Sequence, residues 1–365
     1  MDDSALKYWN ALALFGKFGS QRFKKMLRRF SSPEEAFKAS AGQLIRCGLE
    51  DKLVEEFAVW REKIQPEREW AKLAAEGMTI ITLKDAAYPK LLREIHNPPA
   101  LLYVKGKLTA EDEFAVGVVG TRKISPYGRQ VTPEIVRDLA NSRLTVVSGL
   151  ALGTDTLAHR EALKCGGRTL AVLGSGINQQ SVYPPANRGL AADIVKSGGA
   201  LISENPFGTP PLKQNFPHRN RLIAGLSLGV LVVEAPAKSG ALITAKFALE
   251  QNREIFAVPG SIYNPNSIGP NNLIKMGAKP ATSAADILDG LSLTQAASFM
   301  ENKRMIPDTR EEAILLKYLG REPLHIDELK KICELDIAVI GGTLTMMEMK
   351  GKVRHLGGMY YVLAY

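Results

Sequence analysis

The stretch "GVLVVEAPAKSGALITAKFALEQNREIFAVPG", residues 229–260, contains the unit that the middle of this chain repeats. It opens with a short run of Val and Leu, continues with a segment of helical length and closes with a second apolar run. Short apolar runs that do not alternate with polar residues are typical of strands buried on both faces of a sheet. The stretch therefore predicts a strand, a helix and a second, parallel strand.

Similar apolar runs precede this stretch. They are "FAVGVVG" from Phe114, "LTVVSG" from Leu144, "TLAVLG" from Thr169 and "ALISE" from Ala200. Segments of helical length separate them, so strand and helix alternate. This alternation predicts an α/β fold, a Rossmann-like, doubly wound and mostly parallel sheet, which we assign to residues 81–290.

Residues 1–80 show helical periodicity and predict a small helical domain. Ser32 is expected to cap a helix whose first residue is Pro33. The basic run "RFKKMLRR", residues 22–29, has two interpretations. It is either a patch that faces phosphates or a solvated helix face.

The end of the chain predicts a linker over residues 291–308 and a winged-helix domain over residues 309–365. Three short helical segments are followed by a hairpin that turns at Gly357-Gly358. The segment "AVIGGTLTMM", residues 338–347, stands where a recognition helix would read a DNA groove, yet it carries no charge. Groove binding is therefore disfavoured, and a protein-contact or regulatory role is left open.

Charge is unevenly distributed along the 365 residues, whose net charge is +9. Residues 1–110 carry an excess of five positive charges, residues 111–290 an excess of four, and residues 291–365 none. Any surface for a polyanion is therefore expected in the first two parts. The three cysteines are far apart in the sequence and predict reduced thiols in a cytoplasmic protein. We expect neither a signal peptide nor a membrane span.

Ligands of open parallel sheets bind beyond the carboxyl ends of the strands, so the loops there are the candidate site. In "GTRKISPYG", Gly120 permits a tight turn, Thr121 and Ser125 offer hydroxyls, and Arg122 can form paired hydrogen bonds to a phosphate. The glycine spacing is neither that of a dinucleotide-binding loop nor that of a P-loop. We therefore expect no nicotinamide cofactor and no Walker-type nucleotide hydrolysis.

The loops after the next two strands extend this site. Gly149 and Gly153 would let backbone amides approach a ligand, and Asp155 is expected to cap the following helix. The loop after the third strand ends in Asn187 and Arg188.

The segment "NFPHRNRLIAGLS", residues 215–227, supplies the densest polar cluster. A short helix from Asn220 would place Arg219 and Arg221 near its N-terminus, where they face phosphates. Phe216 either stacks on an unpaired base or belongs to the core. The alternative for the arginines is that one of them pairs with Glu204 or Glu234.

Few groups in these loops suit catalysis. His159 lies within a helical segment and is expected to be structural. The carboxylates Asp155, Glu204 and Glu234 could meet at the strand ends, which is the one feature that supports a hydrolase. No histidine pair has metal-ligand spacing, so we assign neither catalytic nor metal-binding residues.

Seven segments within residues 118–278 together resemble the DNA-processing protein A family, also called DprA or Smf. They are "VVGTRKISPYG", "VVSGLALGTDTLAH", "TLAVLGSGINQQSVYPPANR", "ISENPFG", "NFPHRNRLIAGLS", "LVVEAPAKSGALITAKFALEQNREIFAVPG" and "SIGPNNLIKMGA". Their order along the chain is much more specific than any single motif.

The resemblance implies a non-catalytic protein without a cofactor that binds single-stranded DNA through its Rossmann-like core. It also implies that the protein loads a RecA-type recombinase onto DNA taken up in natural transformation, in the presence of single-strand-binding protein. Dimerisation through the Rossmann-like domain is implied too. The terminal domains would then be a sterile-alpha-motif-like domain and a winged helix.

The residues that the resemblance implies match this chain with three substitutions. They are Gly120-Thr121-Arg122, with Thr for Ser; Gly153-Thr154-Asp155, with Thr for Ile; Arg219-Asn220-Arg221, intact; and Ser239-Gly240-Ala241, with Ala for Ser. The hydroxyl needed for a phosphate contact survives at Thr121, whereas one hydroxyl is lost at Ala241.

Two other functions remain as alternatives. The first is a nucleotide N-glycosidic hydrolase of the phosphoribohydrolase group, whose Pro-Gly-Gly-x-Gly-Thr-x-x-Glu signature is absent from "APAKSGALITAK", residues 235–246. The second is a transcription factor acting through the winged helix, which the zero charge of residues 291–365 disfavours.

Overall fold

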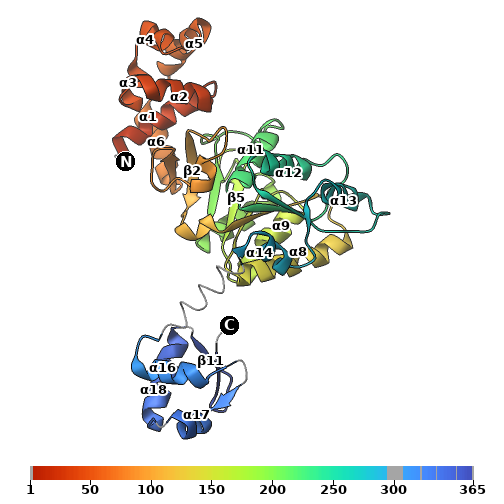
Figure 1. Cartoon of the computed structure of the whole chain (residues 1–365). Coiled ribbons are helices and arrows are strands. Elements are labelled where there is room, and N and C mark those ends of the chain that lie inside the picture. Colours follow the sequence, from red (N-terminus) through yellow and green to blue (C-terminus); the bar gives the residue numbers. More distant parts are fainter. Residues whose placement is uncertain (1–2, 294–306, 321–322, 334, 351, 364–365) are drawn as a thin grey trace. The chain divides into compact units, whose positions relative to one another are not determined.

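The computed structural model describes residues 3–293, 307–320, 323–333, 335–350 and 352–363. The chain forms two compact units, Met1–Leu291 and Ser292–Tyr365, which are described separately below (Figure 1). Most of the predicted linker, residues 291–308, lies outside the described residues.

The first unit begins with a helical module. Its helices are α1 (Asp3–Leu14), α2 (Ser20–Arg29), α3 (Pro33–Lys38), α4 (Ala41–Arg46), α5 (Asp51–Arg61) and α6 (Pro66–Ala75). As predicted, Ser32 caps α3 by accepting a hydrogen bond from the Glu35 amide, and Pro33 is the first helical residue. The module has a packed aromatic interior, in which Phe57 contacts Phe15 and Phe18. The fold type of the module as a sterile-alpha-motif-like domain stays a prediction.

A sheet of nine described strands forms the centre of this unit. The strands are β1 (Met78–Thr82), β2 (Leu101–Gly106), β3 (Ala115–Val119), β4 (Thr145–Ser148), β5 (Thr169–Leu173), β6 (Ala200–Ser203), β7 (Gly229–Val232), β8 (Glu254–Ala257) and β9 (Lys279–Pro280). Their order is β1-β2-β6-β5-β4-β3-β7-β8-β9.

The six predicted strands are β3 to β8, and they pair in parallel as expected. The register places Gly117 of β3 beside Val147 of β4 and beside Val230 of β7. Strands β1 and β2 were not predicted. They pair with each other antiparallel, and β2 pairs antiparallel with β6, so they extend one edge of the sheet.

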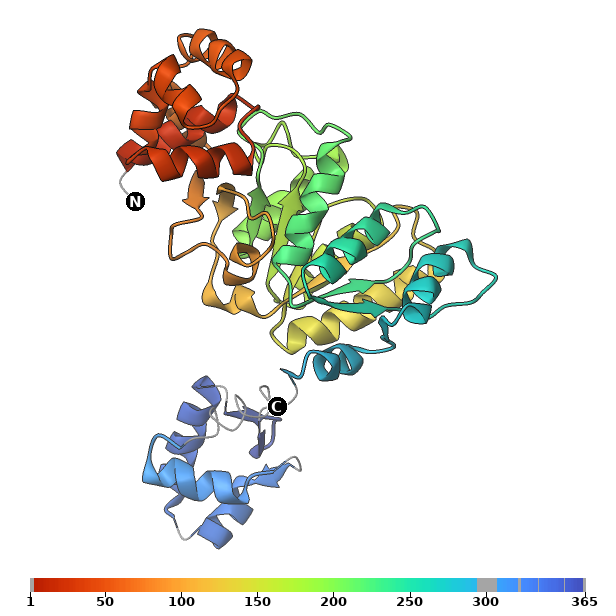
Figure 2. The ribbon, with the colours of Figure 1, turned by 45° about the horizontal axis from the view of Figure 1, so that its top comes forward.

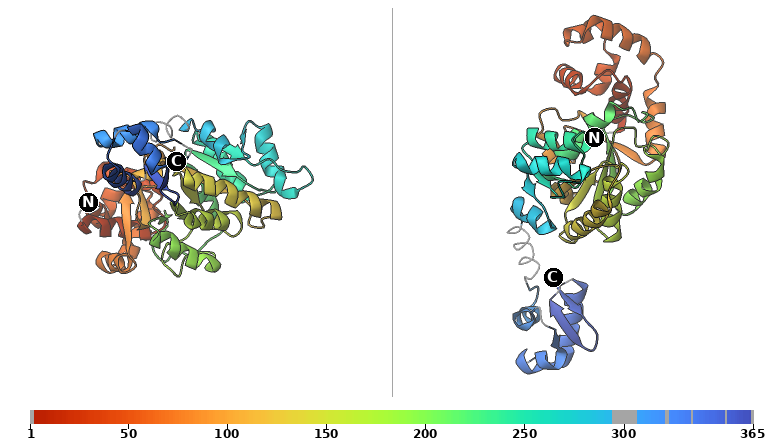
Figure 3. Two further views of the ribbon diagram at one scale, coloured as in Figure 1. Left: turned by 90° about the horizontal axis from the view of Figure 1, so that it is seen from below. Right: turned by 90° about the vertical axis from the view of Figure 1, so that its right-hand side faces the viewer.

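Helices cover both faces of the sheet. They are α7 (Lys90–Arg93), α8 (Pro126–Asn141), α9 (Thr154–Lys164), α10 (Arg188–Lys196), α11 (Asn215–Gly225), α12 (Gly240–Glu250), α13 (Ile268–Lys275) and α14 (Ala284–Gly290), with 3-10 helices η1 (Ala110–Glu113), η2 (Pro185–Asn187) and η3 (Pro265–Ser267). Helices α8 and α9 pack together on one face, and α11 and α12 pack together on the other (Figures 2 and 3). This arrangement is the predicted doubly wound fold.

The helical module and the sheet share one hydrophobic core, so they are not separate bodies. The Tyr103 hydroxyl of β2 donates a hydrogen bond to Asn10 Oδ1 of α1 at 2.9 Å. The predicted domain boundary at residue 80 falls inside β1, which belongs to the sheet from Met78 onward.

The second unit is the predicted winged helix. Its elements are α16 (Arg310–Tyr318), β10 (Leu324–His325), α17 (Ile326–Cys333), α18 (Ile337–Met349), β11 (Val353–His355) and β12 (Tyr360–Leu363). Strands β11 and β12 pair antiparallel around the turn at Gly357 and Gly358, which both have positive φ angles.

A cluster of ion pairs neutralises two lysines of this unit. The buried Glu312 carboxylate accepts hydrogen bonds from Lys350 Nζ at 2.6 Å and from Lys352 Nζ at 2.5 Å. Burial alone would raise the pKa of Glu312, but these bonds and one from the Asp308 amide outweigh it and lower the pKa to about 2. These two lysines are therefore engaged inside the unit.

Candidate nucleic-acid interface

The topology places the candidate site between β3 and β7. Strand order reverses there, because β4, β5 and β6 continue on one side of β3 whereas β7 and β8 lie on the other. Ligands of doubly wound sheets bind at this point, beyond the carboxyl ends of the strands. A cleft of about 660 Å³ opens at this position, and its wall includes Thr121, Arg122, Lys213, Phe216, Lys238 and Gly240.

Three exposed cations line the cleft: Arg122, Lys213 and Lys238. Within the described ranges none of them forms an ion pair, so their charges remain available to a ligand. Arg122 was predicted, but Lys213 and Lys238 were missed. Lys238 directly precedes the helix cap Ser239 in a loop already singled out, and this position was the signal that could have found it.

Two aromatic rings stand beside Arg122. Its guanidinium carbon lies 5.7 Å from the centroid of the Phe216 ring. The Tyr183 ring lies 5.9 Å from Phe216 and is tilted by 50°. Phe216 is half-buried and Tyr183 is 42% exposed. Phe216 thus lines the wall of the cleft and is not part of the core, and its stacking on an unpaired base stays a prediction. Tyr183 is an aromatic neighbour that the sequence did not reveal.

Arg219 lies elsewhere than predicted. Helix α11 begins at Asn215 and not near Asn220, so Arg219 is in the second turn and not at the N-terminus. The side chain is 6% exposed, and Nη1 donates hydrogen bonds to the carbonyl oxygens of Gly149, at 2.6 Å, and Val172. Burial lowers the pKa of Arg219 to about 10. This arginine holds β4, β5 and α11 together and is not a free cation.

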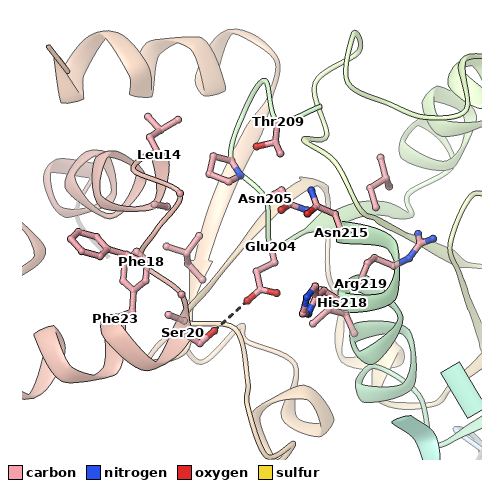
Figure 4. A pocket seen from close by; sticks show the side chains of 18 of the residues that line it. Leu14, Phe18, Ser20, Phe23, Glu204, Asn205, Thr209, Asn215, His218 and Arg219 are labelled. Carbon is pink, nitrogen blue, oxygen red and sulfur yellow. Dashed lines mark hydrogen bonds between the residues drawn. The ribbon is translucent and has the colours of Figure 1, made fainter. Parts of the chain in front are cut away.

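Arg221 lies on the opposite side of α11. Its Nη1 donates to the Asn97 carbonyl oxygen at 2.8 Å, and its Nη2 donates to Glu204. The alternative in which one arginine pairs with a glutamate is therefore the observed arrangement. These groups line a second pocket of about 730 Å³ between α11 and the start of α2 (Figure 4). His218 and Asn215 of α11 face the same pocket.

The loops after β3 and β7, which both contribute residues to the cleft, are held to each other by hydrogen bonds. The buried Glu234 carboxylate accepts hydrogen bonds from the amide and the hydroxyl of Ser125, the amide bond being 2.9 Å long. The Thr121 amide donates to the Glu234 carbonyl oxygen at 2.7 Å. Ser125 also caps α8, because its hydroxyl accepts a hydrogen bond from the Gly128 amide.

Asp155 and Asn187 shape the loop after β4. The expected helix cap is not formed by Asp155, because the cap residue of α9 is Gly153 and Asp155 lies in the first turn. Its buried carboxylate accepts hydrogen bonds from the amides of Gly149, at 3.1 Å, and Ala151, at 3.3 Å. Asn187 is also buried and donates to the Leu150 carbonyl oxygen at 2.8 Å. Both side chains support the loop from inside.

Arg188 is exposed, but its guanidinium also makes internal contacts. Its Nη2 donates to the Gln180 carbonyl oxygen at 2.6 Å and its Nε donates to the Val182 carbonyl oxygen at 3.3 Å. It does not line the cleft.

The glycines of the site permit close packing between loops, which was not the reason expected. A Cβ at Gly149 would lie 2.6 Å from the Arg219 guanidinium carbon. Gly153 has a φ of +80°, and a Cβ there would lie 2.7 Å from the Arg122 carbonyl oxygen. At Gly120 a Cβ would collide with the Thr154 side chain.

The N-terminus of α12 forms the remaining wall. Ser239 caps this helix by accepting a hydrogen bond from the Ala241 amide at 3.3 Å. Asn220 Nδ2 donates to the Gly240 carbonyl oxygen at 3.1 Å and so joins α11 to this helix start. A Cβ at Gly240 would meet no atom within 4 Å, so this backbone is open to the cleft.

The carboxylates do not assemble a catalytic site. Asp155 bonds to loop amides, Glu234 bonds to Ser125, and Glu204 bonds to Ser20 and Arg221. Burial raises the pKa of Asp155, while the Arg219 charge opposes that rise. The hydrolase alternative therefore has no converging pair of acids.

His159 is structural, as expected. Its Nδ1 lies 2.7 Å from Thr169 Oγ1, and burial lowers the pKa of this histidine to about 3. Among the residues that the structure describes, no group of three His, Cys, Asp or Glu side chains could hold a metal ion. No helix in the described part is long and apolar enough to cross a bilayer.

Comparisons with known proteins agree with this architecture. Residues 79–292 match the family model described as DNA recombination-mediator protein A, and residues 303–359 match the DprA winged helix domain. Protein Smf of Escherichia coli is 41% identical over 279 residues, covering 75% of this chain and 74% of that protein.

Two solved structures are similar as well. DNA processing protein A of Streptococcus pneumoniae is 35% identical with a TM-score of 0.66, covering 78% of this chain and 97% of that one. A structure of DNA processing protein A from Helicobacter pylori, described as showing a single-stranded DNA binding mode, is 29% identical with a TM-score of 0.53. It covers 60% of this chain and 97% of that one.

Proposed function

Because the chain belongs to the DNA recombination-mediator protein A family, we propose that it binds single-stranded DNA in the cleft between β3 and β7 and passes the strand to a RecA-type recombinase. The observation that carries the proposal is the convergence of three exposed cations and two aromatic rings at the switch point of the sheet. The binding mode described for the Helicobacter pylori relative supports it.

The cations and the start of α12 would hold the backbone of the strand. Arg122, Lys213 and Lys238 neutralise phosphates, and the N-terminus of α12 adds backbone amides and partial positive charge. Contacts of this kind do not read sequence. Binding is therefore sequence-tolerant and weakens as salt concentration rises.

The aromatic pair would hold the bases. Phe216 presents a half-buried ring whose position is set by Tyr183 and by the Arg122 guanidinium. A base that stacks on an aromatic ring must be unpaired, because a duplex keeps its bases stacked on each other. This requirement gives the cleft its preference for single strands.

The proposal extends to assembly with other proteins. The family name, which describes a recombination mediator, supports transfer to a recombinase, with single-strand-binding protein present on the DNA. Exposed apolar side chains at Ile262, Tyr263 and Met276 suit a homodimer contact of the first unit. Recombinase ATPase activity on coated single strands should rise with the wild-type protein and not with a cleft variant.

The test compares oligothymidine with a duplex of equal length over a range of salt concentrations. The triple variant Arg122→Gln, Lys213→Gln, Lys238→Gln should lose about two orders of magnitude in affinity for the single strand. Its log–log salt slope should fall by about 2, since each phosphate contact contributes about 0.7. Phe216→Leu alone should lower the affinity for the single strand about tenfold, which corresponds to the contribution of one stacked base.

A matched control removes three positive charges from the other end of the parallel strands, where their amino ends lie. Lys107 follows β2 at the amino end of β6, Lys196 ends α10 before β6, and Lys275 ends α13 before β9. Their triple replacement by glutamine should leave binding near the wild-type level. Equal losses in both triple variants would show that net charge and not the cleft determines affinity, and the proposal would fail.

A further inference from the structure

Helix α2 carries an unusual charge pattern for a surface helix. Its ten residues, Ser20–Arg29, include five Lys or Arg and no acidic residue, which equals the whole excess of residues 1–110. Helices α5 and α6 of the same module mix acidic and basic residues. The charge of α2 is therefore a property of this helix and not of the module.

The face of α2 that begins against the sheet continues as a basic surface. Ser20 Oγ donates to Glu204 at 3.2 Å, and Gln21 Nε2 donates to Asn97 Oδ1 at 3.3 Å. Residues four apart share a helix face, so Ser20 is followed by Lys24 and Arg28, and Gln21 by Lys25 and Arg29. The opposite face is buried through Phe23 and Met26. We call Lys24, Lys25, Arg28 and Arg29 the α2 patch.

The charges of the α2 patch are not neutralised within the described protein. None of the four side chains forms an ion pair there, and the only hydrogen bond from them runs from Lys25 Nζ to the Gly48 carbonyl oxygen at 2.8 Å. The remaining cation of the helix, Arg22, pairs with Glu50. Like charges four residues apart destabilise a helix. A bound polyanion would relieve this repulsion.

The α2 patch is close to the route by which a strand would leave the cleft. The first turn of α11 borders both spaces, because Phe216 lines the cleft whereas Asn215 and His218 line the second pocket. Ser20 and Phe23 of α2 line the same second pocket from the other side (Figure 4). Beyond that pocket lie Lys24 and Arg28, one and two helix turns further along α2.

Resting on the proposed function, we propose that the α2 patch is a second contact for the same single strand of DNA, reached across the first turn of α11. The strand binds the patch through its phosphates, so the footprint extends from the cleft onto the helical module. A lipid surface fits less well, since a membrane-bound helix needs an exposed apolar face. The apolar residues Phe23 and Met26 are buried inside the module.

The test measures affinity against the length of oligothymidine with the full chain. The variant Lys24→Gln, Lys25→Gln, Arg28→Gln, Arg29→Gln should bind oligomers that fill only the cleft as tightly as the wild type does. For oligomers long enough to saturate wild-type affinity, it should bind at least tenfold more weakly. Its salt slope on these oligomers should fall by up to about 3, since each lost phosphate contact removes about 0.7.

Two further variants separate this effect from net charge and from misfolding. The control Lys52→Gln, Lys63→Gln, Arg68→Gln, Lys84→Gln removes the same charge from exposed side chains of the same unit and should behave as the wild type. The swap Lys24→Arg, Lys25→Arg, Arg28→Lys, Arg29→Lys keeps the charge and should retain long-oligomer binding.

The outcomes separate this inference from the proposed function. If the α2 patch variant and its control bind long oligomers equally, the inference is overturned while the cleft stands. If the wild type binds no oligothymidine of any length, the proposed function itself fails.

Discussion

Arg122, in the loop after β3, and Arg219, in α11, were both predicted to contact phosphates, and the structure gives their side chains opposite environments. Arg122 is exposed over the Phe216 ring, and no acidic residue of the described chain pairs with it. Arg219 is buried and donates to two backbone carbonyl oxygens of neighbouring strand ends. The difference shows that Arg122 is available to bind a ligand, whereas Arg219 stabilises the loops that form the binding site.

The largest expected effect is on stability. Arg219→Met should lower the free energy of unfolding by about 3 to 5 kcal/mol, because it leaves the buried carbonyl oxygens of Gly149 and Val172 without this donor and removes the charge that favours the ionised Asp155 carboxylate. Arg122→Met should cost no more than about 1 kcal/mol, the size of an exposed cation–π contact. Urea unfolding followed by tryptophan fluorescence measures both.

The fluorescence reports only the first unit, since the three tryptophans, Trp9, Trp60 and Trp70, all lie in the helical module. If the two variants lose equal stability, the assignment of a structural role to Arg219 and a ligand-binding role to Arg122 is wrong.

A smaller effect is expected from pH. Removing the Arg219 charge should raise the pKa of Asp155 further above its ordinary value. A carboxyl whose folded pKa is raised stabilises the fold below its unfolded pKa, about 3.9, and loses that contribution as pH rises through the folded pKa. The loss of unfolding free energy caused by Arg219→Met should therefore be smaller at pH 5 than at pH 7, by on the order of 1 kcal/mol.

The control for this prediction is Asp155→Asn, made alone and with Arg219→Met. With the carboxyl absent, the deficit caused by Arg219→Met should not change with pH. A loss of stability that grows as pH falls would contradict the assigned effect of the Arg219 charge on Asp155.

The smallest expected effect concerns Arg221, which makes the comparison sharper because it is partly accessible. A double-mutant cycle with Arg221→Gln and Glu204→Gln should give a coupling of about 1 kcal/mol in the same unfolding assay. A coupling of zero would mean that the pair does not form in solution, and Arg221 would join Arg122 as a cation available to DNA.

Much of the fold could be predicted from the sequence, because the six central strands are buried on both faces and lack any alternation. Strand β1 was missed for the opposite reason, because buried and more exposed positions alternate along it, whereas β2 was missed although it is buried like the central strands. They are antiparallel strands at the edge of the sheet, and they follow a long helical region that contains no comparable run. The pairing of β2 with β6 depends on contacts between distant residues that local pattern does not encode.

The candidate site could be predicted only as a set of loops. Topology brings strand ends together, so the loops after β3, β4 and β7 were placed correctly beside one another. Which polar side chain faces solvent depends on packing. Asn187 and Arg219 are buried because neighbouring backbone groups bond to them, and the residue type alone did not reveal this. Lys213 was missed because an exposed lysine in a proline-containing loop resembles ordinary surface.

The Glu234 carboxylate, held by the amide and hydroxyl of Ser125, fixes two loops to each other in the absence of any ligand. The receptor is thus preorganised, and the polynucleotide, not the protein, gives up conformational freedom on association. The diffusional encounter of the protein with the DNA, and not the closure of a loop, then determines the association rate constant. The loops after β3 and β7 should accordingly superimpose in the structures of the free and the DNA-bound protein.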